Sequence, residues 1–131
     1  MVLHRSTFIK ALRKELPAIE PWLAGYRDNL TLEMMRFRHF TEDALARGDL
    51  GCVRECFRLL KTAFDNGNPH LRNSVVVSYL EHLDFKGAEA AAAQRLLPAD
   101  LAAARSRVRA ALERLNERPA KRTRVRTGRQ N

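Results

Sequence analysis

Residues 49–83, DLGCVRECFRLLKTAFDNGNPHLRNSVVVSYLEHL, decide the fold of this chain. The stretch predicts two helices, at about 50–65 and 69–83, joined by a tight turn. Asp49 and Asn68 stand where the two helices begin, and short polar side chains of this kind accept hydrogen bonds from the free amides of a first helical turn. Because the turn is short, we expect the helices to pack antiparallel as a hairpin at the centre of the molecule.

The turn and the second helix of this hairpin carry further signals. Asn66 and Gly67 predict the end of the first helix, since both residue types tolerate the left-handed conformation of a helix stop. The valines at 75–77 spread apolar surface over more than half of the second helix, which predicts a central helix with neighbours on several faces. A buried strand is the competing interpretation because valine is β-branched. We favour the helix, since cap signals flank it and no other segment resembles a strand.

Helical patterns continue on the N-terminal side. We expect Ser6 to cap a first helix, and Pro21 predicts a break near residues 19–22. Asn29 or Thr31 is expected to cap the next helix. Core-facing positions recur at the three- and four-residue spacing of half-buried helices. They are Phe8, Leu12 and Leu16, then Met34, Phe37, Thr41, Ala44 and Leu45, then Val53, Cys56, Phe57, Leu60 and Phe64 in the hairpin.

The C-terminal side predicts two more helices. Residues 88–97 form an alanine-rich segment, and Pro98 restarts the chain as a last long helix. Its apolar stripe contains Leu101, Ala104, Val108, Ala111, Leu112 and Leu115, and its other face carries Arg105, Arg107, Arg109 and Arg114. The fold class is therefore an all-α, single-domain bundle of five or six helices over residues 1–117, followed by a disordered basic tail at 118–131. A stack of helical hairpins is the weaker version, because the chain has no clear internal repeat.

The net charge of +9 belongs mostly to the tail. Six of the 24 lysines and arginines lie in residues 118–131, which contain no Asp or Glu, so the body has 18 basic and 15 acidic residues. A segment of like charges repels itself and stays disordered. With Arg105 and Arg109, the tail is a candidate binder of nucleic-acid phosphates, although it has no aromatic residue on which a base could stack. The tail residues are Arg118, Lys121, Arg122, Arg124, Arg126 and Arg129.

No pattern of residues predicts catalysis. The chain lacks a Gly-x-Ser-x-Gly turn and a phosphate-binding glycine loop, and its histidines form no ligand pairs of the kind that a structural zinc site needs. We therefore expect no enzymatic activity, no metal and no cofactor. Cys52 and Cys56 are expected to be free thiols, since disulfide geometry is demanding. The N-terminus has no apolar signal-peptide core, and no run of about 18 apolar residues exists, so we expect a cytoplasmic protein.

Two polar residues of the second hairpin helix have two interpretations. Asn73 and Glu81 lie eight residues apart, near one face of the expected central helix. In the structural interpretation, Asn73 binds a neighbouring backbone group and Glu81 pairs with Arg54 or Arg58 of the adjoining helix. In the functional interpretation, both line a groove that binds a ligand or a peptide.

Part of the chain resembles a known group of proteins. The shared residues are Leu59-Leu60, Asn66-Gly67-Asn68, Leu71-Arg72-Asn73, VVSYLEHL at 76–83 and Leu96-Leu97-Pro98. Together, about residues 49–101 resemble small, poorly characterised bacterial helical proteins, several of which look like immunity proteins of polymorphic toxin systems. The most specific elements are Asn73 and the run Ser78-Tyr79-Leu80-Glu81. The resemblance implies a non-enzymatic binding role and supplies no active-site residue.

These observations lead to two functional hypotheses. The first is a protein-binding module that neutralises a toxin domain by covering its active site. Its candidate binding residues are Trp22 and Tyr26, as aromatic anchors, and separately Asn73 and Glu81. The second is a nucleic-acid-associated accessory protein that binds phosphates through its basic end. The body is only mildly basic, whereas inhibitors of nucleases present acidic surfaces. If the partner is a toxin, a nuclease with a strongly basic cleft is therefore not expected.

Overall fold

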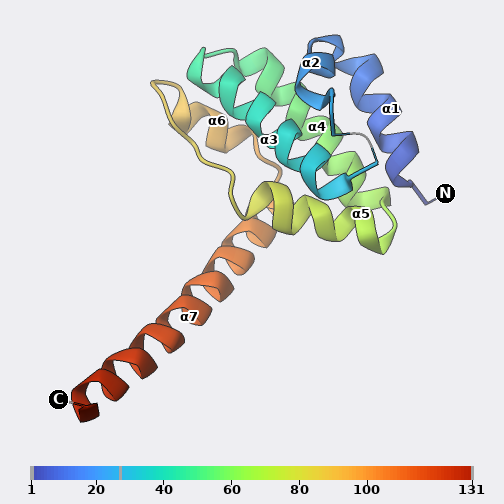
Figure 1. The fold of residues 1–131 in the computed structure, drawn as a ribbon. Helices are drawn as coiled ribbons and strands as arrows, with labels where there is room; N and C mark the ends of the chain where they lie inside the picture. Colours follow the sequence, from blue (N-terminus) through green and yellow to red (C-terminus); the bar gives the residue numbers. More distant parts are fainter. Residues whose placement is uncertain (1, 27, 131) are drawn as a thin grey trace.

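The computed structural model describes the backbone of residues 2–26 and 28–130 and the side chains of residues 2–26 and 28–116. Within that part the chain is helical apart from connecting segments and one isolated bridge between Leu3 and Gly67, which confirms the predicted all-α bundle (Figure 1). The elements in order are α1 (Arg5–Glu15), the 3-10 turn η1 (Pro17–Ile19), α2 (Glu20–Leu23), α3 (Leu30–Ala46), α4 (Leu50–Asn66), α5 (Pro69–Ser74), the π-helix η2 (Val75–Leu80), α6 (Ala90–Leu96) and α7 (Ala99–Gln130).

Three helices begin where polar residues predict them. Asn29, Asp49 and Asn68 each accept a hydrogen bond from the amide three residues further on, at 3.1, 3.1 and 2.8 Å respectively. These bonds satisfy amides that have no partner inside the helix. Asn29 rather than Thr31 is thus the cap of α3.

The N-terminal helix differs from its prediction at both ends. α1 has His4 at its N-cap with no side-chain hydrogen bond, so the assignment of Ser6 as the cap is wrong. The break falls at Leu16, whose φ of −127° and ψ of 72° leave the helical region, and not near residues 19–22. Leu16 precedes Pro17, and the proline ring disfavours the helical conformation of the residue before it. Pro17 therefore ends the helix before Pro21 can act.

Gly67 ends α4 by a different mechanism from the one predicted. Its φ of −69° and ψ of 150° are extended, not left-handed. The N-terminal segment pairs with this turn, because the Leu3 amide donates to Asn66 O at 2.6 Å and the Asn68 amide donates to Leu3 O at 2.9 Å. A Cβ at position 67 would overlap the carbonyl oxygen of Ala63. Glycine is needed here for close approach of the backbone.

The valine run is helical, which excludes the strand interpretation, but it is not α-helical. In η2 the hydrogen bonds span five residues, and the Glu81 amide donates to Val76 O at 2.9 Å. The helix packs against α3, α5 and α7, and its Tyr79 and Leu80 are fully buried. Val77 is 39% exposed, so the prediction that the whole run is core is wrong at this position. The helix ends at Leu80, earlier than the predicted 83.

Aromatic residues hold the centre of the bundle together. Phe37 of α3 lies between Phe8 and Tyr79, with ring centroids 6.2 and 5.0 Å away. Such tilted pairs add to the stabilisation from burial of their apolar area. The Tyr79 hydroxyl forms a hydrogen bond with the Thr41 hydroxyl, which in turn donates to Phe37 O. The one polar atom of the largest core side chain is thereby satisfied, as a buried hydroxyl requires.

A buried ion pair joins α1 to α3. The Glu33 carboxylate, only 1% exposed, accepts two hydrogen bonds from the Arg5 guanidinium, at 2.7 and 3.0 Å. This hydrogen bond, together with the charge of Glu33, raises the pKa of Arg5. A bidentate pair fixes both the distance and the orientation of its partners. It therefore sets how α1 lies on the bundle.

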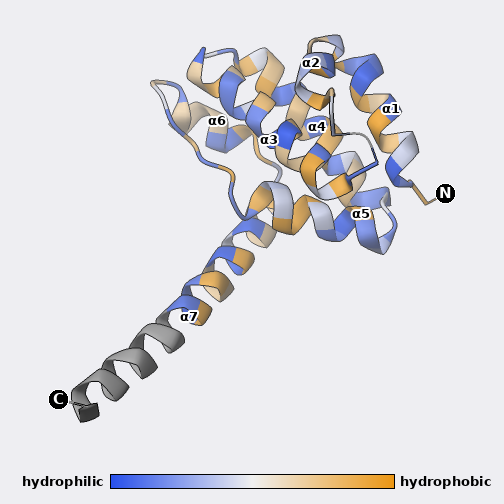
Figure 2. Ribbon diagram, in the orientation of Figure 1, coloured by the Kyte–Doolittle hydropathy of each residue, from blue (hydrophilic) through white to orange (hydrophobic). Residues whose placement is uncertain are grey.

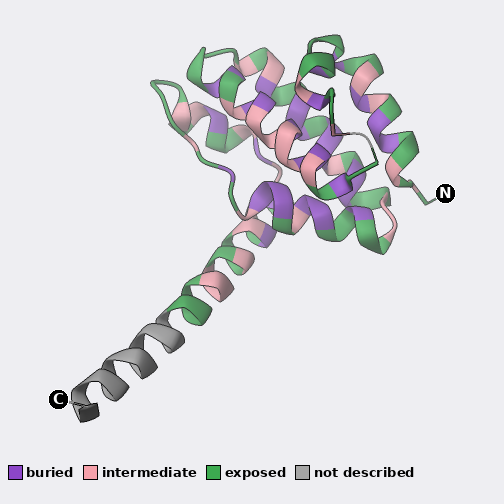
Figure 3. Cartoon of the chain, viewed as in Figure 1, coloured by how far each residue is buried: buried purple, intermediate pink, exposed green. Residues whose placement is uncertain are grey.

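The last helix leaves the body. Leu101 and Ala104 are buried against it, but further along α7 the side chains become half-buried and then exposed (Figures 1 and 3). Leu115 is 62% exposed. None of the helices, over their described residues, combines the length and hydropathy needed to cross a bilayer. The residues predicted as a disordered tail, 118–131, belong in their backbone to α7 as far as Gln130, and their side chains lie outside the described residues.

Candidate functional site

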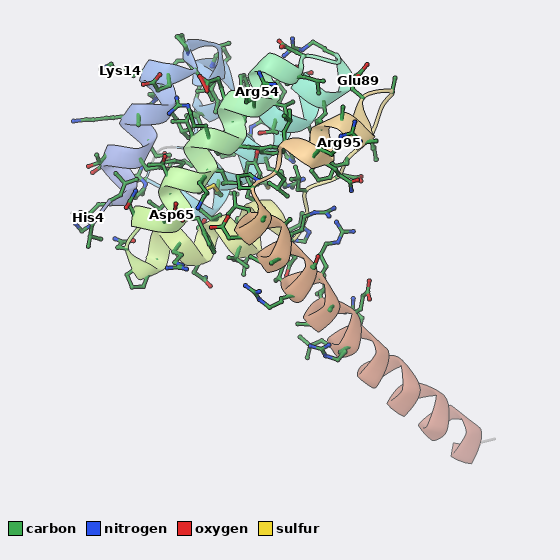
Figure 4. All side chains as sticks on the ribbon, turned by 180° about the vertical axis from the view of Figure 1, so that it is seen from behind. His4, Lys14, Arg54, Asp65, Glu89 and Arg95 are labelled. Atoms are coloured by element: carbon green, nitrogen blue, oxygen red, sulfur yellow. The ribbon has the colours of Figure 1, made fainter. Side chains whose placement is uncertain are left out.

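A groove runs where α7 crosses the end of the hairpin. It consists of two hollows of about 390 and 550 Å³ that share Phe64, Arg72 and Arg107 as lining residues. Val76, Ala104 and Val108 complete one hollow, and Asp65, Asp100 and Ala103 complete the other. We call this feature the α5/α7 groove; Asp65 marks its edge in Figure 4.

Three elements of the fold position the groove. Phe64 lies in the last turn of α4, and the guanidinium of Arg72 on α5 stacks over its ring at 4.5 Å. Lys61 joins α4 to the start of α7, because its ammonium contacts Asp65 and Asp100 at 2.7 Å each. This contact lowers the pKa of Asp100. The cation–π stacking of Arg72 on Phe64 and the contacts of Lys61 with the two aspartates therefore fix the residues that line the groove.

The apolar stripe of α7 continues beyond the groove. Leu112 is half-buried and Leu115 is exposed, and the described part of α7 alternates hydrophobic and hydrophilic residues along its length (Figure 2). The body covers this stripe as far as Leu112 and leaves Leu115 exposed. We call the residues Leu112 and Leu115 the outer stripe.

Trp22 and Tyr26 lie away from this groove and are held in place. The Arg36 guanidinium lies 5.0 Å from the Trp22 ring and 5.6 Å from the Tyr26 ring, and its Nε donates to Trp22 O at 2.9 Å. The indole also packs edge-on against Phe40 at 6.0 Å. Both aromatic residues are half-buried rather than exposed, so the connector is fixed against α3.

Asn73 and Glu81 are not brought together as a buried pair. Asn73 is exposed on α5, whereas Glu81 is half-buried and contacts His82 at 2.8 Å. The expected pairing of Glu81 with an arginine of α4 is wrong for Arg58, which contacts Glu55 at 2.7 Å. The π-helical turn between Asn73 and Glu81 changes their angular relation from that of an α-helix. Glu81 instead lines a separate hollow of about 340 Å³, beside Arg109 and Leu112.

Arg105 and Arg109 have structural contacts. Both guanidinium groups donate to Leu83 O, at 2.9 and 3.2 Å, and Arg38 donates to His82 O at 3.4 Å. These arginines satisfy carbonyls beyond the end of η2. Burial, and then the charge of Arg109, lowers the pKa of Arg105. The other candidates for phosphate binding, Arg118, Lys121, Arg122, Arg124, Arg126 and Arg129, have side chains outside the described residues.

The two cysteines near the start of α4 influence each other's pKa. Both are free; Cys52 is half-exposed and Cys56 is buried. A hydrogen bond from the Cys56 thiol lowers the pKa of Cys52 to about 7, whereas this bond and burial raise the pKa of Cys56. Among the described residues, no group of three or more His, Cys, Asp and Glu side chains is arranged to hold a metal ion.

We expect alkylation of Cys52 by iodoacetamide to rise as the pH passes through about 7, because the thiolate is the reactive form. Cys56 stays unmodified at the same pH. Mass spectrometry of peptides after short exposures between pH 5 and pH 9 measures both. In Cys56→Ala the hydrogen-bond donor is gone, so the midpoint for Cys52 moves upward; an unchanged midpoint would contradict the assigned cause.

The spacing of apolar and polar residues in the sequence did not predict the groove. Phe64 was expected in the core, and it is indeed buried, but the guanidinium of Arg72 stacks over the face of its ring. Arg107 was expected on the solvated face of the last helix. The lining residues come from segments up to 44 positions apart, so no local spacing brings them together.

Comparison with known proteins finds one family. A family model described as "Domain of unknown function (DUF7674)" matches residues 9–112. The match includes α3, the hairpin and the described start of α7, and it extends further toward the N-terminus than the resemblance at 49–101. No curated protein and no solved structure matches the chain.

Proposed function

The chain belongs to the DUF7674 family, whose description assigns no activity, and from the geometry of this member we propose that it is a non-enzymatic protein-binding module. The proposal rests on the exposed apolar surface of α7. Its apolar stripe runs from the floor of the α5/α7 groove, at Ala104 and Val108, to Leu115, which is 62% exposed. Exposed apolar surface beside polar residues is typical of protein interfaces.

The finer proposal is that the partner is a toxin domain, neutralised by occlusion of its active site. It rests on the resemblance of residues 49–101 to immunity proteins. Charges of both signs flank the outer stripe, because Glu81, Asp84 and Glu113 lie near Leu112 as well as Arg109. The body is mildly basic, so a nuclease with a strongly basic cleft is not the expected partner.

Binding of nucleic acid is the competing function. It is less well supported, because Arg105 and Arg109 already donate to Leu83 O. Valine and leucine also interrupt the arginines along α7, at Val108 and Leu112. A nucleic-acid function would give affinity that falls steeply with salt and disappears on truncation after Glu117.

The outer stripe provides the test. We expect Leu112→Asp combined with Leu115→Asp to weaken binding of the protein encoded by the adjacent gene by at least about tenfold, and to abolish any rescue of growth on co-expression. For Leu115→Asp alone, the free energy of unfolding should change by less than about 0.5 kcal/mol, because Leu115 is exposed whereas Leu112 is half-buried. Isothermal titration calorimetry measures the affinity, and urea denaturation measures the stability.

Val2→Asp is the matched control, since Val2 is 56% exposed and lies on the N-terminal segment away from α7. It should leave binding and rescue unchanged. No complex and no rescue with the unmodified protein would contradict the toxin-neutralising proposal. Equal binding by the double variant would contradict the assignment of α7 as the interface.

A further inference from the structure

We infer that the α5/α7 groove binds a short segment of the partner protein in which carboxylates flank an apolar side chain, with Arg72 and Arg107 holding the carboxylates. This inference rests on the proposed protein-binding function and specifies the chemistry of the partner. It assigns the groove a role separate from that of the outer stripe.

The two arginines are placed for this role. Both line each of the two hollows, so they face a common space. Arg72 is held by its stacking on Phe64 at 4.5 Å, and a stacked guanidinium keeps its N–H groups free at the edge. Within the described part of the chain, neither Arg72 nor Arg107 forms an ion pair with a carboxylate. Their charges are available to a ligand.

The charges along the groove are unevenly distributed. The hollow that contains Val76, Ala104 and Val108 has two arginines and no carboxylate in its lining. The other hollow contains Asp65 and Asp100, but both contact the ammonium of Lys61. An anionic group is therefore favoured at the valine-lined end, where no carboxylate of the lining competes for the arginines.

The floor of the groove favours a peptide over other anions. Val76 is half-buried and Ala104 and Phe64 are buried, so an apolar side chain that enters here removes further apolar area from water. A phosphate group would use the arginines and leave this floor uncovered. A second copy of the chain would bring its own Arg107, Arg109 and Arg114 toward the same positive charges.

A displayed library of random 12-residue peptides tests the inference. We expect selection on the unmodified protein to enrich peptides with Asp or Glu next to Leu, Ile or Phe. Fluorescence polarisation with one selected peptide should show affinity at least about tenfold weaker for Arg72→Glu and for Arg107→Glu, because a charge-assisted bond is replaced by repulsion. Replacing the acidic residues of that peptide by Lys should restore binding to the double variant.

Arg54→Glu is the matched control, because Arg54 is an exposed arginine of α4 more than two turns before Phe64 (Figure 4). It makes the same charge change and should bind the selected peptide with unchanged affinity. Circular dichroism and the thermal midpoint establish that each variant is folded. Selected peptides without acidic residues, or equal affinity for the Glu variants, would overturn the inference.

Further measurements distinguish the proposed peptide segment from other occupants of the groove, and the inference from the proposed function. Binding of a 20-nucleotide single-stranded DNA that displaces the peptide, or concentration-dependent dimerisation lost in the Arg107→Glu variant, would assign the groove to another occupant and overturn the inference. If the full partner binds the Arg72→Glu/Arg107→Glu variant normally but not the outer-stripe variant, the proposed function stands and the inference fails. If neither the partner nor any peptide binds the unmodified protein, the proposed function fails as well.

Discussion

Replacement of Arg5 by Ala is expected to lower the free energy of unfolding by about 3–5 kcal/mol. The reason is the carboxylate that remains: Glu33 is 1% exposed, and among the described residues both hydrogen bonds to its side chain come from Arg5. Without the guanidinium, the Glu33 carboxylate must stay charged at a buried position that has lost its paired cation, or take up a proton. Either outcome destabilises the folded state, whereas in the unfolded chain the Glu33 carboxylate is solvated and no such cost arises. Urea denaturation at pH 7 measures the change.

Arg13→Ala is the matched control. Arg13 also lies on α1 and also pairs with a glutamate, Glu20, at 2.9 Å, but the Glu20 side chain is 53% exposed, against 1% for Glu33. Exposed ion pairs contribute about 0–1 kcal/mol. If Arg5→Ala cost no more than Arg13→Ala, burial would not be the cause. Replacing Arg5 and Glu33 together by apolar residues of similar size should recover most of the loss, since no unpaired charge is then left.

The second large effect is expected at the turn between α4 and α5. In Gly67→Ala the new methyl group overlaps the carbonyl oxygen of Ala63 and comes within 3.2 Å of Leu71. The obstacle is backbone, so the turn itself must move, together with its hydrogen bonds to Leu3. We expect a loss of about 1–3 kcal/mol, the usual range for overpacking.

Gly51→Ala makes the same chemical change where there is room. Gly51 lies in the first turn of α4, and the atom nearest to its added methyl group is a carboxylate oxygen of Asp49 at 3.7 Å. Alanine should stabilise the helix here by up to about 1 kcal/mol. Opposite signs for the two variants in urea denaturation are the expected result. Equal effects would mean that the close approach at Gly67 relaxes without cost.

The features that were predictable from sequence are those specified locally. The caps at Asn29, Asp49 and Asn68 need only one side chain and the next turn of backbone, and all three form as expected. Apolar spacing likewise identified the core positions of α3 and α4. The end of α1 is also specified locally, although we predicted it at the wrong place. A proline restricts the conformation of the residue before it, so Pro17 already ends the helix at Leu16.

The remaining features depend on partners that are distant in sequence. Arg5 and Glu33 are 28 positions apart, and nothing near either residue indicates that the other will be its partner. The arginine contacts to Leu83 O depend on where α7 crosses η2. The local pattern of the valine run favours a helix over a strand, but it does not distinguish the π-helix of η2 from an α-helix.

The wide turn of η2 also has an evolutionary consequence. A π-helix accommodates an extra residue without adding a side chain to the core, and in η2 the residues turned outward are Val76 and Val77, while Tyr79 and Leu80 stay inside. Substitutions at 76 can therefore alter the floor of the groove, and substitutions at 77 the exposed surface of η2, while the buried Tyr79 and Leu80 keep their packing. Under the proposed function, these two positions are where the binding surface can change while the stability of the bundle is retained.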